Sequence, residues 1–124
     1  MPKLLIAEDD LMLLEIYQKK FTDSGFEVFL AENGKIALGI AKKEKVDIVL
    51  TDSIMPELDG FDLIKGLRNG EFDPSIKIIM LSNIGEGDNR KKAIDLGANG
   101  FIPKSKFTPT ELVIEVKKIV EVGG

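Results

Sequence analysis

Several residues suited to phosphoryl transfer stand at or just after the ends of short apolar runs of the chain. They are three carboxylates, a hydroxyl and an amine: Glu8, Asp9, Asp52, Ser82 and Lys104. Carboxylates that lie close together repel one another, and a cation that prefers oxygen ligands, such as Mg²⁺, relieves this repulsion. A carboxylate can also act as a nucleophile, while an ammonium and a hydroxyl can bind phosphoryl oxygens. The residue types therefore predict a phosphoryl-transfer site with a metal ion, provided that the fold brings them together.

These residues meet only if the apolar runs are neighbouring strands of one sheet. The runs that we predict as strands are Lys3–Ala7, Glu27–Leu30, Val46–Thr51, Ile76–Leu81 and Gly100–Ile102. Several are apolar without a break, which is typical of parallel strands that are covered on both faces. In such sheets, ligands bind beyond the carboxyl ends of the strands. If the first and third strands are adjacent, the three carboxylates share one edge of the sheet, which Ser82 and Lys104 also face.

Segments with apolar residues at helical spacing separate the strands. The predicted apolar stripes are Leu13, Ile16, Tyr17 and Phe21; Ile36, Ala37, Ile40 and Ala41; Leu63, Ile64 and Leu67; Ala93 and Leu96; and Leu112, Val113, Val116, Ile119 and Val120. Gly25, Gly70 and Gly97 follow three of these stripes, where a left-handed residue commonly ends a helix. Asp10 and Thr108 are suited to cap the first and the last helix. The alternation predicts an α/β fold in which helices cover both faces of a parallel sheet.

The composition excludes several classes of function. The chain has 124 residues, 44% of them hydrophobic and 31% charged, which fits one domain with an ordinary core. It has no histidine and no cysteine, so the usual zinc sites, histidine-activated nucleophiles and disulfides are excluded. A net charge of −4 without a basic stripe argues against direct nucleic-acid binding. No apolar run reaches about 18 residues, the length needed to span a membrane. We therefore expect a single domain over residues 1–124 in a reducing cytoplasm, without membrane contact.

The order of the motifs resembles the receiver domain of two-component response regulators. The segment from Asp52 to Gly60 is similar to the D-x-x-M-P-x-x-D-G run of that family, with Glu8-Asp9 before it and Ser82 and Lys104 after it. The similarity extends over the whole chain. It implies a flavodoxin-like α/β fold related to the chemotaxis regulators: a (βα)5 unit with a doubly wound, parallel, five-stranded sheet in the strand order 2-1-3-4-5.

The resemblance implies a phosphoacceptor switch. Such a domain is not an enzyme with a separate substrate, although it assists its own phosphorylation and dephosphorylation. Asp52 would take a phosphoryl group from a sensor histidine kinase or a phosphotransfer protein. Mg²⁺ would be the cofactor, bound directly by Asp9, Asp52 and the backbone carbonyl of Ile54. Glu8 would act on the ion mainly through a metal-bound water.

The resemblance also implies how phosphorylation changes the molecule. Lys104 would contact Asp52 at rest and the phosphoryl group afterwards. Ser82 would move to the phosphoryl group, and Phe101 would be an aromatic switch that moves with it. The surface formed by the fourth helix, the fifth strand and the fifth helix would then bind a downstream effector or output domain. A homodimer formed on phosphorylation is a further expectation for this surface.

Two residues depart from the pattern of the receiver family. Ser105 stands where the family usually has a proline after the lysine, and Asn83 follows Ser82 in place of a small apolar residue. Ser105 bears on the reach of Lys104, and Asn83 bears on the rates of phosphorylation and hydrolysis.

Three other functions are alternatives to this switch. They are a Mg²⁺-dependent phosphatase or nuclease, a receiver fold that only binds proteins, and a nucleotide-binding flavodoxin-like protein. The first lacks the usual D-x-D pair at a strand end, and the last lacks a glycine-rich loop after the first strand.

Overall fold

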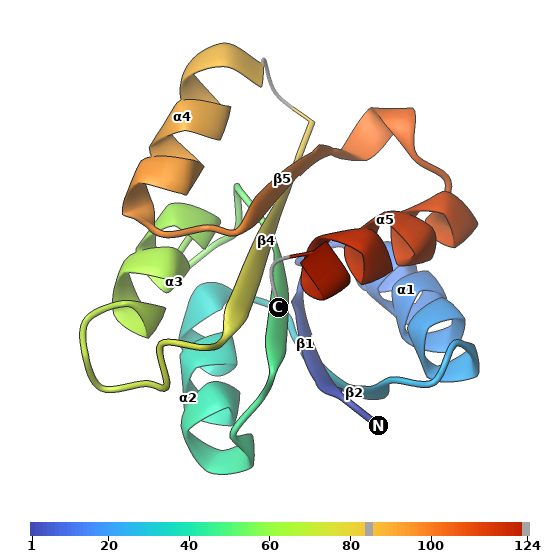
Figure 1. Ribbon diagram of the computed structural model, residues 1–124, viewed down its shortest axis with the longest axis horizontal. Helices are drawn as coiled ribbons and strands as arrows, with labels where there is room; N and C mark the ends of the chain where they lie inside the picture. Colours follow the sequence, from blue (N-terminus) through green and yellow to red (C-terminus); the bar gives the residue numbers. More distant parts are fainter. Residues whose placement is uncertain (84–85, 123–124) are drawn as a thin grey trace.

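Five parallel strands form one sheet in the order β2-β1-β3-β4-β5. The computed structural model describes residues 1–83 and 86–122, and Figure 1 shows the sheet between two groups of helices. The strands are β1 Lys3–Ala7, β2 Glu27–Ala31, β3 Ile48–Asp52, β4 Lys77–Ser82 and β5 Gly100–Pro103. Every neighbouring pair is parallel. The predicted α/β fold and its strand order are therefore confirmed.

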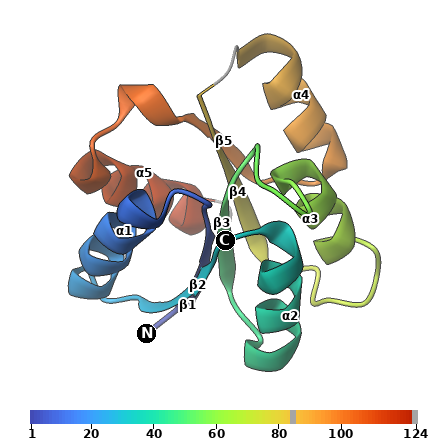
Figure 2. The same cartoon turned by 180° about the vertical axis from the view of Figure 1, so that it is seen from behind.

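Helices cover both faces of this sheet. They are α1 Leu11–Asp23, α2 Gly34–Glu44, α3 Gly60–Leu67, α4 Glu86–Leu96 and α5 Pro109–Val122. α1 and α5 lie on one face, whereas α2, α3 and α4 lie on the other (Figures 1 and 2). A short 3₁₀ turn, η1 Lys104–Lys106, follows β5 directly. The sequence did not predict this turn, which carries Lys104 to the carboxyl edge of the sheet.

The strands send alternate side chains into two apolar clusters, one under each helical layer. In β3, Val49 belongs to the cluster under α2, α3 and α4, whereas Ile48 and Leu50 belong to the cluster under α1 and α5. In β1, Leu5 and Ile6 divide in the same way. All five side chains are buried, and each contributes about 1.5–3 kcal/mol to the hydrophobic stabilisation. Burial on both faces is what the unbroken apolar runs predict.

Short polar side chains begin the helices. Asp10, Asn33 and Asp59 each cap the helix that follows them by accepting a backbone N–H of its first turn. Thr108 and Glu111 form a reciprocal capping box at the start of α5, with distances of 3.1 and 2.9 Å. Gly25 and Gly97 have positive φ and lie directly after the ends of α1 and α4, as predicted, whereas Gly70 has positive φ but lies two residues beyond Arg68, the C-cap of α3. The predicted capping roles of Asp10, Thr108, Gly25 and Gly97 are therefore confirmed.

The structure corrects the predictions at the strand ends and on two helices. β3 begins at Ile48 and β4 at Lys77, later than the predicted runs, which start at Val46 and Ile76; Asp52 and Ser82 are the last residues of these strands. Ile16 and Ile36 belong to predicted apolar stripes, yet each is 41% exposed. The buried face of α1 runs along Leu14, Tyr17 and Phe21 and that of α2 along Gly34, Ala37 and Ala41, so it is turned away from these two isoleucines.

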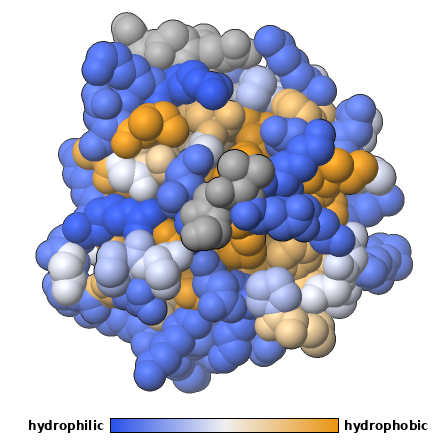
Figure 3. All heavy atoms as spheres, viewed as in Figure 1, coloured by the Kyte–Doolittle hydropathy of each residue, from blue (hydrophilic) through white to orange (hydrophobic). Residues whose placement is uncertain are grey.

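The surface is mixed in character. Hydrophilic side chains cover most of the face in Figure 3, and hydrophobic atoms show in several separate areas. Leu11 and Met12 at the start of α1 and Ile54 after β3 are exposed, so apolar surface lies beside the carboxyl ends of the central strands. Across the part of the chain that the structure describes, no helix combines the length and the hydropathy needed to cross a bilayer.

Candidate functional site

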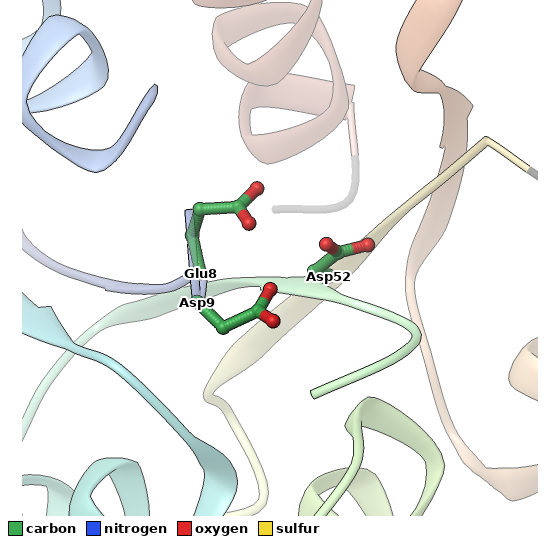
Figure 4. Close-up of side chains that lie close together, drawn as sticks. All are labelled: Glu8, Asp9 and Asp52. Atoms are coloured by element: carbon green, nitrogen blue, oxygen red, sulfur yellow. The ribbon is translucent and has the colours of Figure 1, made fainter. Parts of the chain in front are cut away.

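Three carboxylates meet at the carboxyl ends of β1 and β3. The register pairs Ala7 with Thr51 across these adjacent strands, so Glu8 and Asp52, which come next, lie side by side. One carboxylate oxygen from each of Glu8, Asp9 and Asp52 lies within 4.8 Å of the others. The three side chains point into a common space (Figure 4). The predicted convergence of these carboxylates is confirmed.

Glu8 is the buried member of this acidic group, with an exposed fraction of 1%. Its Oε2 accepts the backbone N–H of Asp10 at 3.0 Å, and its Oε1 accepts a hydrogen bond from the ammonium of Lys104. A buried carboxylate needs such partners because desolvation of the charge is costly. Sequence reasoning missed this ion pair, because 96 residues separate the two partners, and gave Glu8 a role mainly through a metal-bound water.

Lys104 bridges Glu8 and Asp52. Its Nζ donates to Asp52 Oδ2 at 3.0 Å, and the exposed fractions of the two side chains are 10% and 14%. The contact predicted between Lys104 and Asp52 is therefore present. The peptide bond between Lys104 and Ser105 is trans, so the serine at position 105 does not keep Lys104 from reaching the acceptor. The other oxygen of Asp52, Oδ1, accepts the backbone N–H of Ser53 at 2.8 Å.

The electrostatics of the site follow from burial and from this bridge. Burial raises the pKa of the Glu8 carboxyl most, the negative charge of Asp52 adds to the rise, and the hydrogen bond from Lys104 opposes it. Burial also acts to lower the pKa of Lys104, but the hydrogen bond to Glu8 and the charge of Asp52 outweigh it, so the pKa is raised. Lys104 therefore stays charged. One ammonium faces three carboxylates, which leaves an excess of negative charge that a divalent cation would offset.

Ser82 ends β4 on the same edge of the sheet. Its buried hydroxyl accepts a hydrogen bond from the hydroxyl of Ser53 at 3.3 Å. Sequence reasoning did not single out Ser53, and its place directly after Asp52 is the only signal that could have marked it.

Asp9 is the exposed member of the acidic group. The part of the Ile54 carbonyl in metal binding stays a prediction.

Close packing beneath Asp52 explains the glycine of the Asp59-Gly60 pair. A Cβ at Gly60 would lie 2.1 Å from the backbone oxygen of Asp52, a separation that no side chain can tolerate. The Gly60 N–H donates to the carbonyl of Ser53 at 3.0 Å. The start of α3 therefore packs directly against the end of β3 and fixes the backbone that carries Asp52.

Phe101 lies in β5 with its side chain in the cluster under α2, α3 and α4. The Arg90 guanidinium of α4 lies 5.9 Å from the centre of its ring, and Arg90 Nη1 donates to the Phe101 carbonyl at 3.5 Å. The residue thus connects β5 with α4 in its buried position. Its movement on phosphorylation stays a prediction.

A pocket of about 600 Å³ lies away from these residues. Its lining includes Val46 and Asp47, which precede β3, and Ile76 and Lys77, which lie at the start of β4, so the pocket is at the opposite end of the sheet. None of the carboxylates of the acidic group takes part in its lining. A large pocket is the usual first candidate for a small-molecule site, but the groups suited to phosphoryl chemistry lie on the carboxyl edge.

The family model for the response regulator receiver domain matches residues 4–117. The chain belongs to this family. Among solved structures, this receiver domain is similar to the chemotaxis protein CheY4 of Vibrio cholerae, with a TM-score of 0.88 and 27% identity over 96% of this chain and 98% of that chain. It is also similar to the receiver domain of the Francisella response regulator 1452, with a TM-score of 0.87 and 29% identity over 100% of both chains.

Two longer proteins are similar in sequence to this receiver domain. They are the phosphate regulon transcriptional regulatory protein PhoB of Pseudomonas aeruginosa, 32% identical over 121 residues, and the transcriptional regulatory protein CusR of Escherichia coli, 31% identical over 122 residues. Each match takes in 98% of this chain but 52% of the relative. The chain therefore spans about half the length of these relatives.

Proposed function

We propose that this receiver domain is a phosphoacceptor switch of a two-component phosphorelay, with Asp52 as the acceptor. The position of the Asp52 carboxylate supports this most directly. Lys104 Nζ lies 3.0 Å from its Oδ2, and one oxygen each from Glu8 and Asp9 lies within 4.8 Å of an Asp52 oxygen. A carboxylate nucleophile beside a fixed positive charge and beside further oxygen ligands has the parts that phosphoryl transfer requires.

The acidic group fits Mg²⁺, which binds oxygen ligands and commonly takes one or two protein carboxylates. Asp9 and Asp52 would bind the ion directly, together with the backbone carbonyl of Ile54. Glu8 would act through water, because its two oxygens already accept hydrogen bonds from Lys104 and from the Asp10 N–H. When bound, the ion supplies positive charge that offsets both the carboxylates and the phosphoryl oxygens.

In the transfer step, a carboxylate oxygen of Asp52 attacks the phosphorus of a phosphohistidine on the donor protein. The new O–P bond forms as the P–N bond breaks, and the released imidazole takes up a proton from solvent. Lys104 moves from Asp52 Oδ2 to a phosphoryl oxygen, and the Ser82 hydroxyl donates to another. Attack of water on the acyl phosphate later releases inorganic phosphate and restores the carboxylate. Asp52, Lys104 and Ser82 are the catalytic residues of this scheme.

Ser82 and Phe101 carry the change to the surface. When Ser82 turns towards the phosphoryl group, Phe101 would move inward or outward with it. Arg90 contacts both the ring and the carbonyl of Phe101, so a shift of Phe101 would reach α4. The surface of α4, β5 and α5 would then bind a downstream effector or output domain, or a second copy of the chain.

The partners and setting follow from family membership and charge. The donor would be a sensor histidine kinase or a phosphotransfer protein in the cytoplasm, acting on a single receiver domain over residues 1–124. The net charge of −4 disfavours direct contact with nucleic acid. PhoB and CusR are transcriptional regulatory proteins, which supports an output domain as the effector to test first.

Incubation with Mg²⁺ and acetyl phosphate separates this function from its rivals. We expect each chain to take up at most one phosphoryl group, as a base-labile acyl phosphate that intact mass spectrometry detects. A phosphatase would instead consume the donor many times over without retaining phosphate. A receiver fold that only binds proteins would neither take up phosphate nor consume the donor. Repeated turnover of acetyl phosphate, or no reaction with it, would contradict the proposal.

Mg²⁺ should also stabilise the fold, because it relieves repulsion that exists only in the folded state. At ten times its dissociation constant, the ion should raise the free energy of unfolding by about 1.4 kcal/mol. Urea unfolding with and without millimolar MgCl₂, at constant ionic strength, measures this. Asp9→Asn should reduce the effect, whereas Asp62→Asn on the exposed side of α3 should retain it. If the free energy of unfolding of the wild-type chain does not change with Mg²⁺, the acidic group binds no such ion.

A further inference from the structure

The two serine hydroxyls at the ends of β3 and β4 form a buried pair. Ser53 Oγ donates to Ser82 Oγ at 3.3 Å, and each residue is 2% exposed. One of them directly follows the acceptor Asp52, and the other is the hydroxyl that must reach the phosphoryl group. The pair therefore joins the acceptor strand to the strand that responds.

The register of the sheet explains why the hydroxyls meet. Asp52 pairs with Leu81 across β3 and β4, so the next residues, Ser53 and Ser82, are also neighbours. Met80, two residues before Ser82, belongs to the cluster under α2, α3 and α4, which places the Ser82 side chain on that face of the sheet. The phosphoryl group would instead stand on Asp52, whose carboxylate points into the acidic group.

The backbone of Ser53 is held from three directions. Its N–H is shared between Asp52 Oδ1 at 2.8 Å and the Leu81 carbonyl at 3.0 Å. Its carbonyl accepts the N–H of Gly60 at 3.0 Å. Because these contacts fix the main chain of Ser53, its Cβ stays beside Ser82, and the bond between the two hydroxyls is lost when Ser82 turns about χ1.

We propose that Ser53 is a positioning residue that holds the Ser82 hydroxyl in its resting place and thereby slows the switch. This inference rests on the proposed phosphorylation of Asp52. To reach a phosphoryl oxygen, Ser82 must break the bond to Ser53, and the buried Ser53 hydroxyl then loses this partner, which is unfavourable. The separation of 3.3 Å exceeds the about 2.7–2.8 Å of a strong hydroxyl pair, so the bond is weak enough for phosphorylation to break it.

Removing the Ser53 hydroxyl should therefore speed phosphorylation. In Ser53→Ala, the resting state loses a hydrogen bond and the switched state no longer contains a buried hydroxyl deprived of its partner. Both effects favour the switched state, and together we expect a rise of about two- to tenfold in the rate constant for phosphorylation by acetyl phosphate. Ser53→Thr keeps the hydroxyl and should restore the wild-type rate.

A double-mutant cycle tests whether the effect passes through Ser82. The rate constant would be measured at saturating Mg²⁺ for the wild-type chain, S53A, S82A and the double variant S53A/S82A, with urea unfolding of each. We expect S82A to be slow and the gain from S53A to disappear in the S82A background. Thr51→Val serves as a matched control, because Thr51 is a buried hydroxyl of β3 that donates to the Asp52 carbonyl and should show no coupling to S82A.

The outcomes distinguish this inference from the function on which it rests. If the wild-type chain takes up phosphate but S53A changes the rate equally with and without S82A, Ser53 acts on something other than Ser82 and the inference is overturned. A rate for S53T as high as that of S53A would overturn it as well. If the wild-type chain takes up no phosphate at Asp52, the proposed function itself fails, and the role of Ser53 fails with it.

Discussion

Replacing Asp52 with asparagine will abolish uptake of a phosphoryl group from acetyl phosphate. An amide has no nucleophilic carboxylate oxygen, and the roles proposed for Glu8 and Asp9, as the partner of Lys104 and as a ligand of the metal ion, leave neither carboxylate to attack phosphorus in its place. The fold should survive the change, because the amide oxygen of the new side chain can still accept the hydrogen bond that Lys104 gives to Asp52. Loss of a negative charge beside Glu8 also removes one cause of the raised pKa of that carboxyl. We therefore expect the free energy of unfolding to change by less than about 1 kcal/mol.

Intact mass spectrometry after incubation with Mg²⁺ and acetyl phosphate measures this loss. The matched control is Asp62→Asn, which makes the same chemical change at an exposed position in the first turn of α3 and should leave uptake intact. Phosphorylation of the Asp52→Asn chain at the wild-type level would mean that another carboxylate is the acceptor.

Replacing Lys104 with methionine will destabilise the fold in the absence of Mg²⁺. Methionine keeps the volume of the lysine stem but leaves Glu8, which is almost fully buried, without the ammonium that compensates its charge. Breaking a buried ion pair from one side commonly costs 3–5 kcal/mol, and we expect about 3 kcal/mol at neutral pH, because Glu8 can take up a proton instead. The control is Lys19→Met. Its ion pair with Asp23 spans 3.7 Å between side chains that are 80% and 65% exposed, so it should cost less than about 1 kcal/mol.

The destabilisation of the Lys104→Met chain should shrink as the pH falls. Burial raises the pKa of Glu8, and the Lys104 hydrogen bond is the largest influence that lowers it, so its removal raises the pKa further. A carboxyl whose pKa is higher in the folded chain than in the unfolded chain binds protons more tightly when folded. The contribution of Glu8 to stability is therefore most favourable at a pH below the pKa that the carboxyl has in the unfolded chain. This contribution is lost as the pH rises through the higher pKa that the carboxyl has in the folded chain. Urea unfolding at neutral pH and at about pH 5 should show a smaller deficit at the lower pH. A deficit that grows on acidification would mean that Glu8 is not its cause.

The α/β class of the fold could be predicted from local patterns, whereas the acidic group also needed the strand order that the family resemblance implies. Unbroken apolar runs with helical stripes between them leave few arrangements besides a parallel sheet with helices on both faces. The carboxyl ends of adjacent parallel strands meet at one edge, so the convergence of Glu8, Asp9 and Asp52 follows if β1 and β3 are neighbours, and the resemblance to receiver domains supplied that strand order. The glycines that follow helices and the polar residues that precede them located the helix ends to within about three residues.

Contacts between distant segments could not be predicted in this way. The pairing of Glu8 with Lys104 joins the ends of β1 and β5, and no local pattern links them. Arg68 at the end of α3 is a second case: it donates to the carbonyls of Pro74, Ile76 and Gly97 at 3.1, 2.8 and 3.1 Å. The hydroxyl pair of Ser53 and Ser82 needs the register of β3 against β4, which side-chain spacing alone does not fix.

The most direct test of the central claim is to locate the phosphoryl group on the chain. After incubation with Mg²⁺ and acetyl phosphate, reduction with borohydride converts a phosphorylated aspartate into homoserine, and sequencing of the peptides by mass spectrometry identifies its position. If Asp52 is the acceptor, homoserine will be found at position 52, and its yield will depend on Mg²⁺. Homoserine at any other position, or the same yield without a divalent ion, would contradict it.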